Sequence, residues 1–270
     1  MLRRLAPFLA DLWQNRELLW QFTRRNFELT LRGSHLGLIW SFLNPLLMLG
    51  LYVFVFGFIF GGKFGAIPNE TRVDFALGIF LGLTIFGLTA EVLGMSPTVV
   101  SANPNFVKKV VFPLEVLPAA AVGASIMRMT IGLIFVVAGI VLLGPGPDAG
   151  ILWLPVIILP VILGCLGAAW LISSLGVFIQ DINQLMAFIT QVIMYASALF
   201  YSERIIPPAA WTFMRFNPVL LAIELSRDVA LWHEPMNFRR LGYLYAVGLA
   251  ACFVGHYAFR RLKPAFADVL

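Results

Sequence analysis

Charged side chains are scarce in this sequence and make up only 12% of its 270 residues. A soluble domain carries roughly 25% charged residues, so this composition excludes an ordinary soluble enzyme or binding domain. Hydrophobic residues account for 60% of the chain, and its mean hydropathy is +0.88. We therefore expect an all-α polytopic membrane protein.

Cysteine and histidine are also rare, with two and three copies. Both cysteines lie in apolar segments, which favours small buried side chains over a disulfide or a metal site. His233-Glu234 begins like the zinc motif H-E-x-x-H, but Asn237 occupies its fifth position. We expect neither a metal nor a cofactor on this chain.

A third deficit is the absence of a recognisable catalytic motif. Residues 57–64 fit G-x-x-x-x-G-K, but Phe64 replaces the serine or threonine that binds Mg²⁺ in a P-loop, and no strand precedes the segment. No serine or cysteine lies in a nucleophile motif. We therefore predict that the chain is not an enzyme and that it does not bind ATP.

What the chain does have is long apolar runs with basic flanks. The first 34 residues are basic, contain an imperfect amphipathic helix and lack the features of a cleavable signal; residues 36–60 follow without an ionisable side chain. The net charge of +5 does not indicate nucleic-acid binding, because the basic residues sit at segment ends. An Arg-rich flank stays in the cytoplasm, so we predict that both termini are cytoplasmic.

Six apolar segments are long enough to be candidate membrane spans. We find no repeat and no linker, so residues 1–270 form one domain: a cytoplasmic interface helix (1–34), a transmembrane region (35–260) and a tail (261–270). The expected spans are 36–60, 75–95, 116–143, 151–179, 182–201 and 241–259.

The inner loop after the second span predicts a short helix. Pro104 suits a first helical position with Asn103 as its cap, and Lys108 and Lys109 suit the C-terminal turn. Phe106 and Val110 are spaced i, i+4, so we expect them to insert together into a cleft on a partner protein.

Glu91 and Arg128 place charge inside predicted spans, where ionisable groups are costly. A structural pair and a role in a transport pathway both remain open. Glu91 is expected near the inner end of its span and Arg128 near the middle, which argues against direct pairing. Aromatic side chains that pack between helices or line a path for sugar rings include Tyr52, Phe56, Tyr195 and Tyr201.

The outer stretch 202–240 is expected to form two short helices that are delimited by two breaks at prolines. The breaks are Pro207-Pro208 and Asn217-Pro218, and Trp211 lies between them. Such a stretch would lie at or in the outer leaflet.

Three sets of motifs together resemble the membrane subunit of polysaccharide ABC exporters, which move O-antigen, teichoic acid or capsule. The sets are Arg32-Gly33-Ser34 with Leu36-Gly37, Trp40 and Asn44-Pro45; Asn103-Pro104 with Lys108-Lys109, Phe112-Pro113 and Leu117-Pro118; and Asn217-Pro218 with Glu224-Leu225-Ser226-Arg227.

This resemblance implies a homodimer in the bacterial inner membrane with two separate ATP-binding subunits, which carry ATP and Mg²⁺. The interface helix, with Arg24, Arg25 and Arg32, and the inner loop would contact those subunits. The stretch 202–240, with Glu224 and Arg227, would be a re-entrant outer gate. A lipid-linked polysaccharide would enter between the first and fifth spans.

Two other functions remain open at this point. A membrane-embedded sugar or acyl transferase needs acid–base or metal groups at one membrane face, and no such spacing is recognisable here. An ion-coupled transporter needs paired acids near the midplane, which are scarce.

Overall fold

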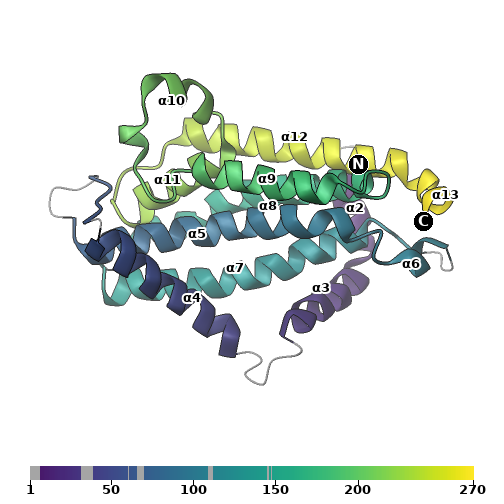
Figure 1. Ribbon diagram of the computed structural model, residues 1–270, viewed down its shortest axis with the longest axis horizontal. Coiled ribbons are helices and arrows are strands. Elements are labelled where there is room, and N and C mark those ends of the chain that lie inside the picture. Colours follow the sequence, from purple (N-terminus) through teal and green to yellow (C-terminus); the bar gives the residue numbers. More distant parts are fainter. Residues whose placement is uncertain are drawn as a thin grey trace.

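The computed structural model is all-helical over the residues that it describes, namely 7–31, 39–59, 61–65, 70–108, 112–144, 146 and 148–270. By length and composition, four of its helical stretches can cross a membrane. They run side by side along the long axis of the molecule (Figure 1). Their main helices are α5 (Arg72–Met95), α7 (Val116–Leu142), α8 (Leu154–Gly176) and α12 (Phe238–Leu262).

The first and fifth expected spans contain shorter helices. The first is α4 (Ile39–Tyr52), continued by the π-helix η1 (Val53–Ile59), and α4 passes through Pro45 without ending. The fifth is α9 (Ile182–Tyr195), whose 14 residues rise about 21 Å, less than a hydrocarbon core of about 30 Å. The all-α membrane fold is therefore confirmed with four long spans, and the count of six stays a prediction.

The short helices gather at the two ends of this bundle (Figure 1). We call these ends the α10 end and the α6 end. The α10 end has η4 (Glu203–Ile205), α10 (Pro208–Met214) and α11 (Pro218–Ala230), and η3 (Ala149–Trp153) precedes α8. The α6 end has α2 (Pro7–Gln14), α3 (Arg16–Leu31), η2 (Ser96–Thr98), α6 (Pro104–Lys108), η5 (Lys263–Ala265) and α13 (Phe266–Val269).

Helix α5 lies at the centre of the bundle and is buried around most of its circumference. Its sequence is apolar on all sides, as expected for a helix with neighbours on every face. Thr71 begins it with a capping box, in which the Thr71 and Asp74 side chains each accept a backbone N–H. Helix α5 is thus the element against which the surrounding helices pack.

Helices α8 and α12 approach each other closely because glycine lies at their contacts. A side chain on Gly167 would collide with the backbone of Ala251, and one on Gly255 would collide with the backbone of Gly167. Small residues permit this close apposition of backbones in membrane proteins.

The C-terminal tail is folded onto the bundle. Phe266 is fully buried and packs edge-on against Phe259, with ring centroids 5.4 Å apart. Lys263 pairs with Glu115 at the start of α7, at 2.9 Å. The tail thus fixes the α6 end of α12 against α7.

Candidate functional site

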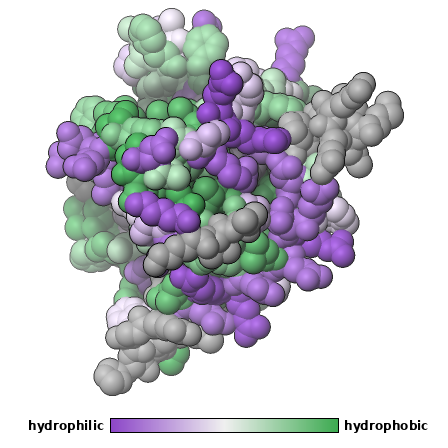
Figure 2. All heavy atoms as spheres, turned by 90° about the vertical axis from the view of Figure 1, so that its right-hand side faces the viewer, coloured by the Kyte–Doolittle hydropathy of each residue, from purple (hydrophilic) through white to green (hydrophobic). Residues whose placement is uncertain are grey.

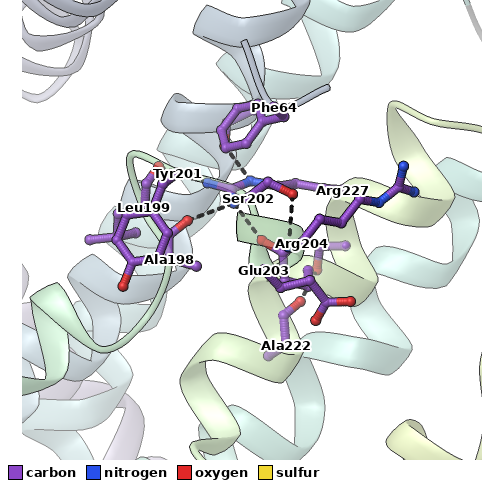
Figure 3. Close-up of polar contacts among 12 residues, drawn as sticks. Phe64, Ala198, Leu199, Tyr201, Ser202, Glu203, Arg204, Ala222 and Arg227 are labelled. Carbon is purple, nitrogen blue, oxygen red and sulfur yellow. Dashed lines mark hydrogen bonds and ion pairs between the residues drawn. The ribbon is translucent and has the colours of Figure 1, made fainter. Parts of the chain in front are cut away.

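The buried side chain of Arg227 organises the α10 end (Figure 3). It pairs with Glu224 one turn earlier on α11, at 2.7 Å. Its remaining hydrogen bonds go to backbone carbonyls of Gly78 in α5 at 3.0 Å, and of Ala198 and Leu199 after α9 at 2.8 and 2.9 Å. One side chain therefore joins α5, α11 and the segment that follows α9.

Burying this charge costs several kcal/mol, so it needs partners of good geometry. The Phe64 ring is a further partner through a cation–π interaction, because its centroid lies 4.2 Å from the guanidinium carbon of Arg227. Phe64 is held in turn because its N–H and that of Gly65 donate to the Glu70 carboxylate, at 2.8 and 2.7 Å. The backbone N–H groups at the end of the P-loop-like segment, residues 57–64, are thus bound to a carboxylate of the protein itself.

The segment that follows α9 adopts a backbone conformation that its sequence does not predict. Ala198 has a φ of +50°, a conformation that costs a non-glycine residue about 1–3 kcal/mol. Asn217 stabilises it by donating to the Ala196 carbonyl at 2.9 Å, while its side-chain oxygen accepts the N–H of Val219 and so caps α11. The two predicted short helices are confirmed, beginning at Pro208 and Pro218.

Ion pairs tie the rim of the α10 end together. Arg240 contacts Glu203 at 2.9 Å, and Arg204 contacts Glu234 at 3.1 Å. A hydrogen bond from the Gly150 N–H, helped by nearby His233, lowers the pKa of the exposed Asp148 carboxyl. Within this rim, Pro207 precedes α10 as its N-cap and Trp211 lies half-buried on α10.

Glu91 and Arg128 do pair, contrary to the expectation from depth. The Arg128 Nε lies 3.0 and 2.9 Å from the two carboxylate oxygens of Glu91, and its Nη2 lies 3.1 Å from the Ser125 hydroxyl. Helical side chains slant towards the N-terminus, so on antiparallel α5 and α7 these two slant towards each other. In addition, the helical rod of α5 continues through Thr98, which leaves Glu91 deeper than its distance from Met95 suggests.

This pair lies in a groove of about 310 Å³ between α4, α5 and α7. Tyr52 borders the groove, and its ring centroid lies 5.7 Å from that of Phe200 in the segment after α9. Tyr201 donates its hydroxyl to the Tyr195 carbonyl, and Tyr195 is exposed. The side chain of Phe56 lies outside the described residues.

At the α6 end, the predicted short helix is present and begins at Pro104. Its Phe106 ring packs against Phe22 of α3 and against Phe112, with centroids 5.5 and 4.7 Å apart. Phe106 therefore packs within the chain, but its ring is only partly buried, and the expectation that it inserts into a cleft of a partner stays a prediction. Asn105 and Lys108 remain exposed.

The side chain of Asn103 differs from its predicted role as the N-cap of α6. Its side-chain amide donates to the carbonyl of Val99 at 2.9 Å, so this group holds the preceding turn. Lys109 and Val110 lie outside the described residues, as does Arg32.

The interface helix lies against the bundle by one face. Leu19, Phe22 and Thr23 face inward, and Thr23 contacts Gly123 of α7, where a larger residue would collide with it. Arg24 is exposed and pairs with Glu28 at 2.8 Å, and Arg25 lies 5.4 Å from the Phe22 ring centroid. Figure 2 shows this end of the molecule, where hydrophilic side chains surround hydrophobic ones.

Sequence reasoning missed the contact that docks α2. Asp11 lies 3.2 Å from Nε2 of the buried His256 in α12 and 3.6 Å from Arg260. His256 packs edge-on against Trp170, whose indole N–H donates to the Glu115 carbonyl. A lone histidine in an apolar span was the available signal, but its partner is distant in sequence.

Residues 17–231, from α3 to the end of α11, match the family described as ABC-2 type transporter. The chain belongs to this family. The match spans the α3 and α6 surfaces, the groove and the α11 network, and it confirms the family relationship expected from the sequence motifs.

Relatives with assigned names align over most of the chain. An O-antigen export system permease protein, RfbA, from Klebsiella pneumoniae is 26% identical over 255 residues, covering 94% of this chain and 95% of that protein. RfbA of Myxococcus xanthus is 23% identical and covers 98% and 99%. The polysialic acid transport protein KpsM of Escherichia coli is 22% identical and covers 85% and 87%.

Proposed function

We propose that this chain is the transmembrane subunit of an ATP-driven exporter that moves a lipid-linked polysaccharide of the O-antigen type across the bacterial inner membrane. The observation that carries the proposal is the alignment, over 85–98% of the chain, with proteins named for O-antigen export and polysialic acid transport. The four long apolar helices supply the membrane region that this function requires.

ATP binding and hydrolysis belong to a separate subunit in this proposal, with two such subunits on a homodimer of the chain. The α6 end is the surface that meets them. There α3 and α6 pack through Phe22 and Phe106, which makes them one unit, and they leave Arg24, Asn105 and Lys108 exposed for contact. Because the unit also rests on α7 through Thr23, movement of the ATPases would reach a spanning helix.

The α10 end is the outer gate in this proposal, with α10 and α11 re-entering the outer leaflet. Arg227 supports this role because it joins α11 to α5 and to the segment after α9. A gate helix held at one buried point can move as a rigid piece about it, and the ion pairs of Arg240 and Arg204 at the rim can then break and re-form.

The experiment is reconstitution of the chain into proteoliposomes with its candidate ATPase. We expect a lipid-linked glycan to stimulate hydrolysis and to appear in the opposite leaflet, while the same glycan without its lipid does neither. The chain alone should hydrolyse no ATP, and Lys63→Ala should leave the assembled activity unchanged, because Lys63 lies in the loop that Glu70 occupies. Hydrolysis by the isolated chain that Lys63→Ala abolishes would contradict the proposal.

A further inference from the structure

We propose that the groove between α4, α5 and α7 binds the phosphate headgroup of an anionic membrane lipid through Arg128, and that Glu91 occupies this position when the lipid is absent. The inference deepens the proposed function and rests on it only where the lipid is the carrier of the exported glycan.

The groove is lined by one face of α4 on one side and by α5 and α7 on the other. Trp40, Asn44, Met48 and Tyr52 follow one another at every fourth residue of α4, so they share that face. The volume of about 310 Å³ is in the range of pockets that hold small ligands, about 300–1,000 Å³.

The polarity of the lining changes along the groove. Towards the α6 end it presents Glu91, Arg128 and Ser125, and towards the α10 end it presents Phe80 and Leu83. A ligand that matches both parts has a charged head and an apolar tail. If the α6 end is cytoplasmic, the head lies towards the inner leaflet and the tail points into the hydrocarbon core.

The Arg128 guanidinium is the group that would recognise the head. Its planar donors match the oxygens of a phosphate as well as they match a carboxylate. Its side chain is 23% exposed, so an incoming lipid can reach it. Inside a membrane a guanidinium needs an anionic partner, and Glu91 now supplies one.

Glu91 is suited to leave this position. Its side chain is 41% exposed, and within the described residues its carboxylate accepts hydrogen bonds from Arg128 alone. Replacing it by a phosphate keeps the arginine neutralised, and the displaced Glu91 carboxylate has the exposed side of its side chain through which to reach water.

A purely structural ion pair would respond differently to mutation. If the pair only fastens α5 to α7, removing either charge weakens the fold and affects lipid binding in the same direction. If Glu91 competes with a phosphate, removing its charge strengthens binding, whereas removing the charge of Arg128 weakens it. Opposite effects of the two substitutions on lipid affinity would therefore identify the exchange.

The test is native mass spectrometry of the purified full chain in detergent, without any ATPase. The probes are a long-chain polyprenyl monophosphate, the matching polyprenol, phosphatidylglycerol and phosphatidylcholine. We expect Glu91→Gln to bind the phosphate lipid several-fold more tightly. We expect Arg128→Gln to bind it about tenfold or more weakly, which is the worth of a charge-assisted hydrogen bond.

Arg261→Gln is the matched control, because it removes an exposed positive charge at the α6 end away from the groove, and it should bind like the wild type. If Arg128→Gln does not fold, Arg128→Lys keeps the charge and should bind with intermediate affinity. Equal binding of polyprenol and polyprenyl phosphate, or Glu91→Gln binding that is no tighter than wild type, would overturn the proposal.

The two sources of phosphate are separated by the same titrations. Tighter binding of polyprenyl phosphate than of phosphatidylglycerol supports a site for the glycan carrier. Equal binding supports a site for bulk anionic lipid. Neither result depends on export, so loss of export with binding intact would count against the proposed function and not against this site.

Discussion

The hydroxyl of Tyr245 in α12 donates a hydrogen bond of 3.0 Å to the carbonyl oxygen of Val156 in α8. This carbonyl lies four residues before Pro160, which has no N–H to complete the helical hydrogen bond. In a membrane an unpaired backbone carbonyl is costly, so a neighbouring helix has to supply the donor. Helix α12 thereby makes the proline in α8 tolerable.

This relationship predicts that Tyr245→Phe and Pro160→Ala are coupled. Tyr245→Phe should destabilise the wild-type permease by about 0.5–1.5 kcal/mol, the usual worth of one hydrogen bond. In a Pro160→Ala background the same change should be nearly neutral, because alanine restores the helical donor. Thermal unfolding of the four solubilised proteins measures the coupling.

Tyr257→Phe is the control for that cycle, since Tyr257 is 72% exposed on the same helix. It should leave the unfolding temperature unchanged in both backgrounds. An equal loss for Tyr245→Phe with and without Pro160 would show that the hydroxyl acts elsewhere.

Arg227→Lys should destabilise the α10 end although it keeps the charge. A lysine has three donors at one point and cannot reach carbonyls on α5 and after α9 together with Glu224. Removing the hydrogen-bond partner of a buried polar group costs about 1–3 kcal/mol, and several such bonds are lost here, so we expect a large drop in unfolding temperature and loss of export. Arg239→Lys, at an exposed position in the first turn of α12, should change neither. Wild-type stability of Arg227→Lys would refute the central role of this side chain.

Much of the helix plan follows from local sequence. Apolar length predicted the four long spans, the rule for proline at a first helical position predicted the start of α6, and the proline breaks predicted the two short helices α10 and α11. These signals act over a few residues, so they are visible without knowledge of the fold. The family could be predicted too, because its motifs are short runs of residues that can be recognised in the sequence alone.

The contacts between elements could not be predicted in the same way. Depth measured from helix ends misplaced Glu91 because it ignored the slant of side chains and the extension of α5 through Thr98. The end of α9 depends on Ala198 with a positive φ, which tertiary contacts impose on a residue that does not favour it. Phe106 was visible as an apolar residue, but its partner Phe22 is distant in sequence.

The orientation of the molecule in the membrane is tested with single cysteines after replacing Cys165 and Cys252, both buried. An impermeant maleimide added to intact cells should label Lys63→Cys at the α10 end. It should label Asn105→Cys and Ala267→Cys at the α6 end only after permeabilisation. All three positions are exposed, so each can react once the reagent reaches its side of the membrane. Ile223→Cys, buried in α11, should stay unlabelled throughout. Labelling of Asn105→Cys in intact cells would reverse the proposed orientation.

The contact between α6 and α3 is predicted to transmit the state of the ATPase. Phe106→Ala should leave the permease folded, because the ring is only partly buried, but it should release α6 from Phe22. We expect ATP hydrolysis to persist while glycan no longer stimulates it. Phe22→Ala should give the same result, and the double variant should be no worse than either single one, because both changes remove the same contact between α3 and α6.

Lys108→Glu separates contact with the ATPase from this internal packing. Lys108 is exposed on α6, so reversing its charge should weaken copurification of the ATPase modestly, as expected for a charge at the rim of an interface. Phe106→Ala should keep the ATPase bound more fully than Lys108→Glu and yet export less. If Phe106→Ala lost the ATPase entirely while Lys108→Glu retained full export, the ring itself would be a contact of the partner, and transmission through α3 would be wrong.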